Sequence, residues 1–403
     1  MIQINDINRI FGIKESWELP EKLMQILDDD IERQKVFDEF LVIEDDLSYD
    51  WFTTYFQEQH SNRESMMQDF TPKEVSGLLP ELAGEYEKVL DVCAGTGGLT
   101  IAVWNKNKTA EFRCEELSTR AFPLLLFNLA IRDINSVAVN KDILTGEVKC
   151  IYRIQNKKIY QMDSVEENQK FDLVIMNPPY SVKYKFDEYD RRFMRYGCPP
   201  SQFADYAFIL HGIDKMTDRG KVIAVLPHGI LFRSGKEGAI RKNLICDDML
   251  DTVIGLPEKL FMNTAIPTCI CIFAKNTGQI LIVDGAKEYT AGGKQNIFKP
   301  ERILEVCRQR KEKLKLASLV TKEEIQENDY NLNIPRYVDT YEPEEIPDII
   351  ETLTELKKIN DEINAANLEF LNMMKELTSE DRQEKRKLLQ AVDIWESMIN
   401  NEG

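Results

Sequence analysis

Short strand-like segments alternate with helical patterns through the middle of this 403-residue chain, and that alternation limits the fold most strongly. By apolar content or by alternation, strands are expected at residues 88–92, 110–116, 137–140, 171–176, 222–226, 252–256, 269–273 and 280–283. Helical patterns occupy residues 15–60 in short pieces, 73–82, the residues after 99, 124–131 and the segments that begin near 204 and 234. Strands that alternate with helices in this way predict an α/β domain with a mainly parallel sheet.

The charge of the chain is unevenly distributed. Residues 1–60 hold 15 acids and 5 bases, net −10, and residues 341–403 hold 16 acids and 7 bases, net −9. The part between them has 38 acids and 39 bases, net +1, within a total of −18. A local basic face is still available there, at Lys183, Lys185, Arg191, Arg192 and Arg195. Because affinity for DNA grows with the number of phosphates neutralised, we expect the chain alone to bind DNA weakly.

The sequence contains no recognisable membrane span, signal peptide or metal-binding motif. The longest apolar stretches, 121–130 and 269–274, are much shorter than the ~20 residues of a membrane span. The start of the chain mixes charges with single apolar residues, unlike a signal peptide. The eight cysteines contain no Cys-x-x-Cys pair, and the three histidines stand far apart. We therefore expect reduced cysteines, a cytoplasmic protein and no metal site.

A glycine-rich segment, Val89-Leu-Asp-Val-Cys-Ala-Gly-Thr-Gly-Gly98, joins the first of these strands to a helix. Glycines let a ligand approach the backbone closely, and ligands of α/β sheets bind at such strand ends. The spacing differs from Gly-x-Gly-x-x-Gly and suits a ligand without a pyrophosphate; a glycine turn without a ligand is the alternative. Glu116 ends the next strand and can accept both ribose hydroxyls, whereas Glu115 alternates to the other face. Asp142 can reach an adenine amino group or cap a turn.

The segment Asn177-Pro-Pro-Tyr180 directly follows the strand at 171–176. Its two prolines end the strand and hold the backbone extended, so that the Asn177 side chain and the Pro178 carbonyl form one rigid pair of acceptors. A planar exocyclic amine is a poor nucleophile, and two acceptors that bind its hydrogens favour the pyramidal, attacking nitrogen. Tyr180 offers a face on which a planar base or amide can stack. The pattern indicates chemistry on a planar amine, with a simple proline turn as the alternative.

These segments resemble amino-group methyltransferases that use S-adenosylmethionine, and most closely the modification subunits of type I restriction–modification systems. Such subunits carry a Phe-Thr-Pro element before the first strand, which here is Gln68-Asp-Phe-Thr-Pro-Lys73. The order of this element, the glycine loop and Asn-Pro-Pro-Tyr is that of one group of DNA adenine methyltransferases. Further similar segments are found at residues 197–200, 204–208, 225–233, 253–257, 266–268 and 328–337, so the resemblance spans roughly 65–340.

The resemblance implies a Rossmann-like, S-adenosylmethionine-dependent methyltransferase sheet over 65–340 that methylates N6 of adenine. The family's acidic ribose contact stands twelve residues before an Asn of the following helix, and counting back from Asn128 gives Glu116. The catalytic residues would be Asn177, Pro178, Pro179 and Tyr180. The cofactor would be bound by Gln68, Asp69, Phe70, Thr71, Pro72, Lys73, Asp91, Ala94, Gly95, Thr96, Gly97, Gly98, Glu116 and Asp142. Family members generally begin with a longer helical domain, whereas residues 1–64 allow a short helical region.

The last sixty residues have a heptad pattern. With position a at Ile346, the a series continues as Leu353, Asn360, Asn367 and Met374, and the d series is Ile349, Leu356, Ile363, Phe370 and Leu377. A second helix is expected at 379–399. Asn at position a lowers stability but specifies register, which favours pairing with a partner helix over packing on the chain's own domain. We therefore predict that residues 341–403 form a coiled-coil-like, partner-binding extension.

The chain contains no room for a separate DNA-reading domain. Segments 181–203 and 276–300 are about 25 residues each, and domains are rarely smaller than ~50. With duplex DNA as substrate, site choice is therefore assigned to another chain that binds the heptad segment. The resemblance implies that this chain is a specificity subunit, and it also allows a restriction subunit. The alternatives are methylation of an RNA base or a protein glutamine amide, a stand-alone DNA adenine methyltransferase, and a binding scaffold without catalysis.

Overall fold

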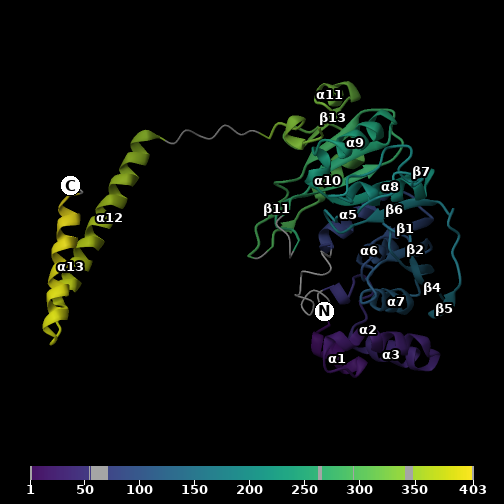
Figure 1. The fold of residues 1–403 in the computed structure, drawn as a ribbon, viewed down its shortest axis with the longest axis horizontal. Coiled ribbons are helices and arrows are strands. Elements are labelled where there is room, and N and C mark those ends of the chain that lie inside the picture. Colours follow the sequence, from purple (N-terminus) through teal and green to yellow (C-terminus); the bar gives the residue numbers. More distant parts are fainter. Residues whose placement is uncertain are drawn as a thin grey trace. The chain divides into compact units, whose positions relative to one another are not determined.

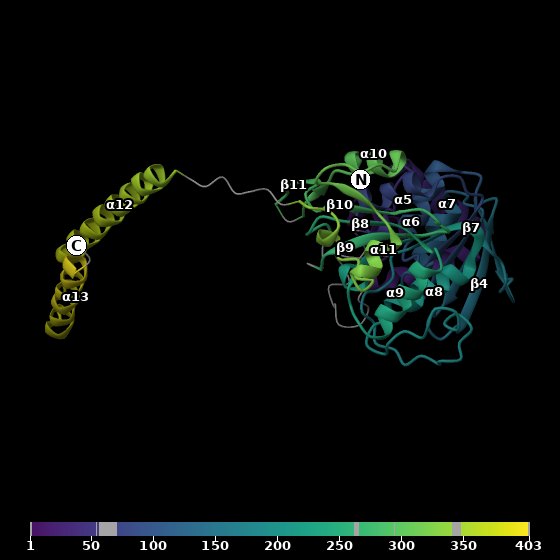
Figure 2. The same ribbon diagram turned by 90° about the horizontal axis from the view of Figure 1, so that it is seen from above.

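The computed structural model describes residues 2–53, 55, 71–261, 266–293, 295–340 and 348–401. The chain divides into two compact units, Met1–Thr340 and Tyr341–Gly403 (Figures 1 and 2). The helices of the first unit are α1 (Ile4–Phe11), α2 (Leu19–Asp28), α3 (Asp30–Ile43), α5 (Lys73–Ala83), α6 (Gly98–Lys106), α7 (Phe122–Ile131), α8 (Asp205–Lys215), α9 (Lys236–Cys246), α10 (Glu301–Gln309) and α11 (Lys322–Glu327). Short 3₁₀ turns lie at Ser16–Glu18, His228–Leu231 and Ile334–Arg336.

The strands of the first unit follow the predicted alternation. They are β1 (Lys88–Val92), β2 (Glu111–Glu116), β3 (Ser136–Lys141), β4 (Val148–Gln155), β5 (Lys158–Met162), β6 (Phe171–Met176), β7 (Met216–Pro227), β8 (Leu250–Gly255), β9 (Thr268–Phe273), β10 (Ile280–Asp284) and β13 (Ala317–Val320). In the described residues these eleven strands form one sheet, in the order β13-β10-β8-β9-β7-β6-β1-β2-β3-β4-β5. A separate small ribbon pairs β11 (Tyr289–Thr290) with β12 (Ile297–Phe298).

The centre of the large sheet is parallel. Strands β3, β2, β1, β6 and β7 form one contiguous parallel block. The antiparallel pairings lie outside it, where β9 runs between β7 and β8, β13 pairs with β10, and β4 and β5 extend the opposite edge. The predicted α/β fold with a mainly parallel central sheet is confirmed.

The sequence pattern did not predict the edge strand β13 or the edge hairpin of β4 and β5. Asn156 and Lys157 form the turn of this hairpin with φ values of +54° and +57°, so both turn residues are left-handed. Such turns are usually recognised by Asn-Gly or Asp-Gly, and this one contains no glycine. Strand β5 is also largely exposed and therefore lacks the apolar alternation of a half-buried strand.

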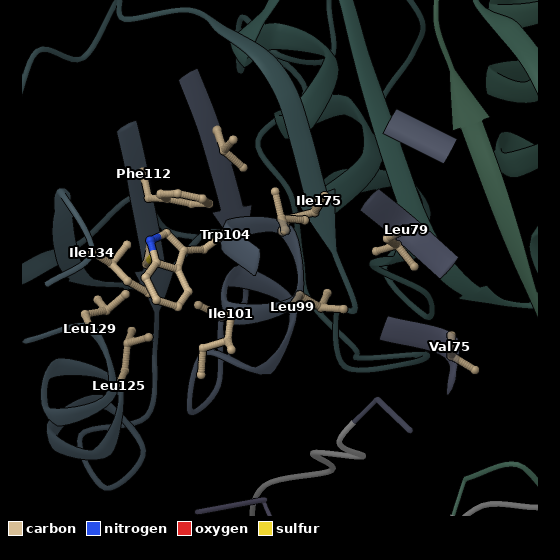
Figure 3. Packing of buried hydrophobic residues seen from close by; sticks show 14 of the residues in the cluster. Val75, Leu79, Leu99, Ile101, Trp104, Phe112, Leu125, Leu129, Ile134 and Ile175 are labelled. Atoms are coloured by element: carbon tan, nitrogen blue, oxygen red, sulfur yellow. The ribbon is translucent and has the colours of Figure 1, made fainter. Parts of the chain in front are cut away.

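Helices cover both faces of the sheet, because successive strand residues point to opposite sides. Val89 belongs to the hydrophobic cluster that includes side chains of α5, α6, α7 and α10, whereas Leu90 belongs to the cluster with α8, α9 and α11. Figure 3 shows the first of these layers, in which the Trp104 ring of α6 lies among side chains of α7 and the sheet. The side chains labelled there come from α5 (Val75, Leu79), α6 (Leu99, Ile101, Trp104), α7 and the turn after it (Leu125, Leu129, Ile134), and the strands β2 and β6 (Phe112, Ile175).

The N-terminal helices belong to the core of the first unit. Every residue of α7 is buried, which is expected of a helix that is apolar on all sides and enclosed by neighbours. The ring of Phe127 lies 5.4 Å from Phe11, 5.2 Å from Phe37, 5.3 Å from Phe40 and 5.5 Å from Phe52, measured between centroids. Residues 4–53 therefore complete the hydrophobic layer beneath the helix that follows β2.

The second unit is a helical hairpin of α12 (Ile349–Glu376) and α13 (Arg382–Asn401) (Figure 1). Phe370 contacts Trp395 at 5.1 Å between ring centroids, and Leu371 is buried in the hairpin. The first half of α12 instead exposes a series of large apolar side chains: Ile349, Ile350, Leu353, Leu356, Ile359 and Ile363. Position 346 of the predicted heptad pattern lies outside the described residues. None of the described helices in either unit combines the length and the hydropathy needed to cross a membrane.

Candidate active site

The two segments singled out in the sequence lie side by side at neighbouring strand ends. Strands β1 and β6 are parallel neighbours, with Asp91 opposite Ile175 and Val92 opposite Met176. The glycine loop leaves β1 at Cys93, and Asn177 leaves β6 directly beside it. Strand order reverses at β1. Strands β2 and β3 extend the sheet on one side of β1, whereas β6 and β7 extend it on the other side. In open α/β sheets this switch point is where ligands bind.

The glycine loop is shaped for a close backbone approach. Cys93, Gly95 and Gly97 have φ values of +64°, +58° and +98°, a left-handed sequence that turns the chain sharply into α6. A Cβ atom on Gly97 would lie 3.0 Å from Cδ1 of Leu125, so the loop also packs tightly against α7. Both constraints favour glycine, because a side chain there would be strained and crowded.

Asp91, at the end of β1, is bonded to the helix that follows this loop. Its side chain is fully buried, and Oδ2 accepts a 2.6 Å hydrogen bond from the hydroxyl of Thr100 in α6. Burial raises the pKa of Asp91 to about 7, a shift that the Thr100 hydrogen bond opposes and the charge of Glu116 increases. A carboxyl group that titrates near neutral pH at a strand end is typical of a functional site.

The adjacent residues Glu115 and Glu116 point in opposite directions. The backbone N–H groups of Gly95 and Ser118 donate to the two carboxylate oxygens of Glu116, at 2.7 and 2.6 Å. Glu116 therefore lies against the glycine loop, where the sequence pattern placed a ribose contact. Its side chain is the one in position to meet a ligand at the loop.

Glu115 lies in a buried ion cluster on the opposite face. It contacts Arg113 at 3.0 Å, Lys141 at 3.6 Å and Nε2 of His211 at 3.0 Å. Burial opposes its charge, but the hydrogen bond from His211 and the charges of the two cations hold the pKa of Glu115 below its ordinary value. Glu115 is therefore occupied by the protein itself.

The Asn177 amide is held in one orientation. Its Nδ2 donates to Oγ1 of Thr71 at 2.9 Å, and the Tyr180 hydroxyl donates to its Oδ1 at 2.8 Å. The Tyr180 ring is buried and lies edge-on to Phe261, with 6.5 Å between centroids. The structure thus brings together Thr71, Asn177 and Tyr180, three of the predicted site residues, at the end of β6. Between them Pro178 is buried and Pro179 is half-buried.

The turn after Tyr180 is fixed by a charged group that sequence reasoning did not assign to the site. Ser181 has a φ of +57°, and its N–H donates to Oδ1 of Asp205 at 2.9 Å. Arg233 donates to the other oxygen of Asp205, also at 2.9 Å, and stacks over Phe203. Both charged residues fall in segments that carry the family resemblance, which was the available signal for them.

The remaining predicted cofactor residues differ in their placement. Gln68, Asp69 and Phe70 lie outside the described residues, whereas Pro72 precedes the first residue of α5, Lys73. Ala94, Thr96 and Gly97 are buried in the glycine loop, and Gly95 and Gly98 are half-buried. Asp142 accepts the N–H of Leu144 at 2.8 Å and so caps its own turn, the alternative left open for it. No cluster of metal-binding side chains occurs in the parts of the chain that the structure describes.

Asp50 was missed entirely by sequence reasoning. The Thr96 hydroxyl donates to its Oδ2, and Nδ2 of Asn128 donates to its Oδ1 at 2.7 Å. This carboxylate therefore joins the N-terminal region to the glycine loop. Nothing distinguishes it in the sequence, since it is one acid among the 15 of residues 1–60.

The predicted basic face is largely neutralised by local acids. Its three arginines all form ion pairs, Arg191 with Asp214, Arg192 with Asp190 and Arg195 with Asp247. Lys183 and Lys185 are exposed. The face is less positive than the sequence suggests, in keeping with the weak DNA binding expected of the chain alone.

Comparisons with known proteins find similar sequences over most of the chain. The profile of the N-6 DNA Methylase family matches residues 44–346. The methylase subunit of the type I restriction enzyme MpnII from Mycoplasma pneumoniae is 31% identical over 339 residues, which cover 75% of this chain and 61% of that protein. The MjaVIII methylase subunit from Methanocaldococcus jannaschii is 29% identical over 341 residues, 78% of this chain and 56% of that protein. This chain thus spans little more than half the length of these relatives.

A solved structure is similar over most of the chain. The methyltransferase subunit of a type I restriction–modification system from Streptococcus thermophilus superimposes with a TM-score of 0.64 at 28% identity. The match covers 84% of this chain and 79% of that one.

Proposed function

This chain belongs to the N-6 DNA methylase family, and we propose that it transfers the methyl group of S-adenosylmethionine to N6 of adenine in duplex DNA. It would do so as the modification subunit of a type I restriction–modification system. The observation that carries the proposal is the pairing of the glycine loop with the Asn177 amide at adjacent ends of β1 and β6. Methyl transfer to an amine requires a cofactor and an amine side by side, which supports assigning the cofactor to the loop and the amine to the Asn177 amide.

The residues at the end of β1 fit S-adenosylmethionine, whose sulfonium supplies an electrophilic methyl group. Gly95 and Gly97 let the ligand approach the backbone, and a Cβ atom at Gly97 would lie in tight contact with Leu125, 3.0 Å from its Cδ1. Glu116 lies at the loop with two carboxylate oxygens suited to the ribose hydroxyls. Asp142 is assigned a lesser role, because its carboxylate caps a turn.

The chain's own contribution to catalysis is orientation of the target amine. Asn177 Oδ1 accepts one amine hydrogen beside the Tyr180 hydroxyl, since an amide oxygen can accept two hydrogen bonds. The Pro178 carbonyl accepts the other, and the nitrogen lone pair then points toward the methyl donor. Tyr180 stacks against the adenine, which must leave the duplex to reach this loop. Thr71 and the Asp205–Arg233 pair keep the loop in place during the reaction.

Sequence reading is assigned to a separate specificity subunit. The described part of the chain forms one α/β unit and one helical hairpin, and the three arginines of the basic face are paired with acids. The exposed apolar side chains of the first half of α12 offer a surface for the helices of such a partner. A restriction subunit would join the same assembly.

Transfer of a radioactive methyl group to different polymers tests the proposal. The chain is incubated with labelled S-adenosylmethionine and duplex DNA, RNA or a protein with exposed glutamines, each with and without a co-expressed specificity subunit. We expect label in duplex DNA only, and only with the partner present. Label in RNA or protein would identify another substrate, and site-specific labelling of DNA by the chain alone would refute the partner-dependent reading.

A further inference from the structure

Asp50 is placed to control the shape of the glycine loop. Its carboxylate accepts four hydrogen bonds, two from its own segment and two from the loop region. Within the segment, Phe52 N–H donates at 3.0 Å and the Thr53 hydroxyl at 2.6 Å. From the glycine loop Thr96 donates its hydroxyl, and from the adjoining α7 Asn128 donates its amide. A carboxylate has about four acceptor positions, so this one is used fully.

Asn128 links this carboxylate to the main chain of the loop. Its Nδ2 donates both to Asp50 Oδ1 at 2.7 Å and to the carbonyl oxygen of Thr96 at 2.8 Å. Its Oδ1 accepts from Arg132 at 2.7 Å, which fixes the orientation of the amide. Thr96 is thus held at its hydroxyl by Asp50 and at its carbonyl by Asn128.

Arg132 anchors the other side of the same segment. Its guanidinium donates to the carbonyl oxygens of Leu47 and Tyr49 at 2.9 and 2.6 Å and lies 3.8 Å from the centroid of the Trp51 ring. Residues 47–53 are therefore fixed to α7 and, through Asp50, to the glycine loop. Because buried polar networks are strong only when every member is satisfied, losing one partner disturbs the whole arrangement.

We propose that Asp50 is a positioning residue for S-adenosylmethionine. It holds Thr96 so that the backbone of residues 95–98 keeps the conformation that the cofactor meets, and it makes cofactor affinity depend on the N-terminal region. This inference rests on the proposed function, because it assigns the cofactor to the glycine loop. Asp50 itself touches the loop through Thr96 and Asn128 and takes no part in the chemistry.

Calorimetric titration with S-adenosylmethionine tests this role in Asp50→Asn and in a matched control, Asp46→Asn. The Asp46 carboxylate lies four residues earlier, accepts the N–H of Ser48, and has no hydrogen bond to the glycine loop among those of the described residues. An asparagine at position 50 retains one oxygen, which can serve two of the four donors. The Phe52 and Asn128 N–H groups can only donate, so that oxygen faces them and the Thr96 hydroxyl loses its charged acceptor. Loss of a hydrogen bond to a charged group is expected to weaken cofactor binding about tenfold, while the control stays within about twofold.

The double variant shows whether Asp50 acts through Thr96. Thr96→Val removes the donated hydroxyl, and its loss of affinity should add little to that of Asp50→Asn, because both remove the same contact. Thr96→Ser, which keeps the hydroxyl, should bind the cofactor several times more tightly than Thr96→Val. If Asp50→Asn does not fold, the comparison of Thr96→Ser with Thr96→Val still tests whether the hydrogen bond to Asp50 supports cofactor binding. In turnover, KM for S-adenosylmethionine should rise in Asp50→Asn with kcat nearly unchanged.

The outcomes separate the two proposals. Failure of the wild type to bind S-adenosylmethionine would refute the proposed function itself. If the wild type binds but folded Asp50→Asn binds equally well, or if Thr96→Val and Thr96→Ser bind alike, the positioning role of Asp50 is wrong. Fully additive losses in the double variant would also overturn it.

Discussion

Replacing Glu115 or Glu116 with glutamine is the same chemical change at adjacent positions, yet the structure predicts opposite losses. Glu115 is fully buried among Arg113, Lys141 and His211. Removing its charge leaves the buried Arg113 without this counter-ion and Lys141 with the more distant, exposed Glu167, which should lower the free energy of unfolding by about 3–5 kcal/mol. The depressed pKa of Glu115 adds a pH signature, since its stabilisation is present above the ordinary carboxyl pKa and is lost as the pH falls through the folded-state value.

Glu116→Gln should instead reduce cofactor affinity. A glutamine has one acceptor oxygen for the Gly95 and Ser118 N–H groups, so the free energy of unfolding should fall by only about 1–2 kcal/mol. The loss of a charged acceptor for the ribose should weaken S-adenosylmethionine binding by at least about tenfold. For Glu115→Gln, affinity measured where the variant is folded should stay within about threefold of wild type.

Urea denaturation and calorimetric titration of both variants provide the two readouts. The assignment of Glu116 to the cofactor would be wrong if Glu116→Gln bound S-adenosylmethionine normally. The assignment would pass from Glu116 to Glu115 if Glu115→Gln lost affinity for S-adenosylmethionine while keeping wild-type stability. Glutamate at position 115 would then have to face the ligand, contrary to its contacts with Arg113 and His211.

Three further predictions follow from the site and the hairpin. Gly97→Ala places a Cβ at a φ of +98° and 3.0 Å from Leu125, so calorimetry should show weakened cofactor binding and denaturation a loss of about 1–3 kcal/mol. Burial raises the pKa of Asp91 to about 7, so the folded state holds this proton more tightly than the unfolded state does. The wild type should therefore lose stability relative to Asp91→Asn as the pH rises through that value. Thermal melts of both proteins at about pH 5 and about pH 8 measure the difference. The third variant carries aspartate at three exposed apolar positions of α12: Leu353, Leu356 and Ile363. It should no longer co-purify with the specificity subunit, because charge enters a seam that is buried in the complex, but it should still bind the cofactor. If the variant unfolds instead, that face packs on the chain's own domain.

The sequence could predict the elements that carry a local signal. Strand and helix alternation, the glycine loop and Asn-Pro-Pro-Tyr depend on apolar pattern, glycine and proline, all of which are legible in a single chain. Glu116 could be separated from Glu115 by strand alternation, and the structure places them on opposite faces. The hairpin at Asn156–Lys157 could not be predicted, because its left-handed turn is formed without glycine.

Long-range polar contacts could not be predicted from the sequence, because a single residue carries no local signal of its distant partner. Asp50 reaches Thr96 across 46 positions and Asn128 across 78, and an aspartate in an acidic segment gives no hint of either partner. The role of Thr71 as the hydrogen-bond partner of Asn177, 106 positions away, is equally invisible before the chain is folded. Such contacts depend on how β1 and β6 are brought together, which local pattern does not specify.

The central claim is that Asn177 orients the N6 amine of adenine for methylation. It is tested most directly by nucleoside mass spectrometry of duplex DNA treated with the chain, its specificity subunit and S-adenosylmethionine. Wild type and the control Asn168→Ala, an exposed asparagine shortly before β6, should produce N6-methyladenine, whereas Asn177→Ala should produce none while binding the cofactor with nearly wild-type affinity. N6-methyladenine formed by Asn177→Ala at most of the wild-type rate, or a different methylated nucleoside from the wild type, would contradict the account.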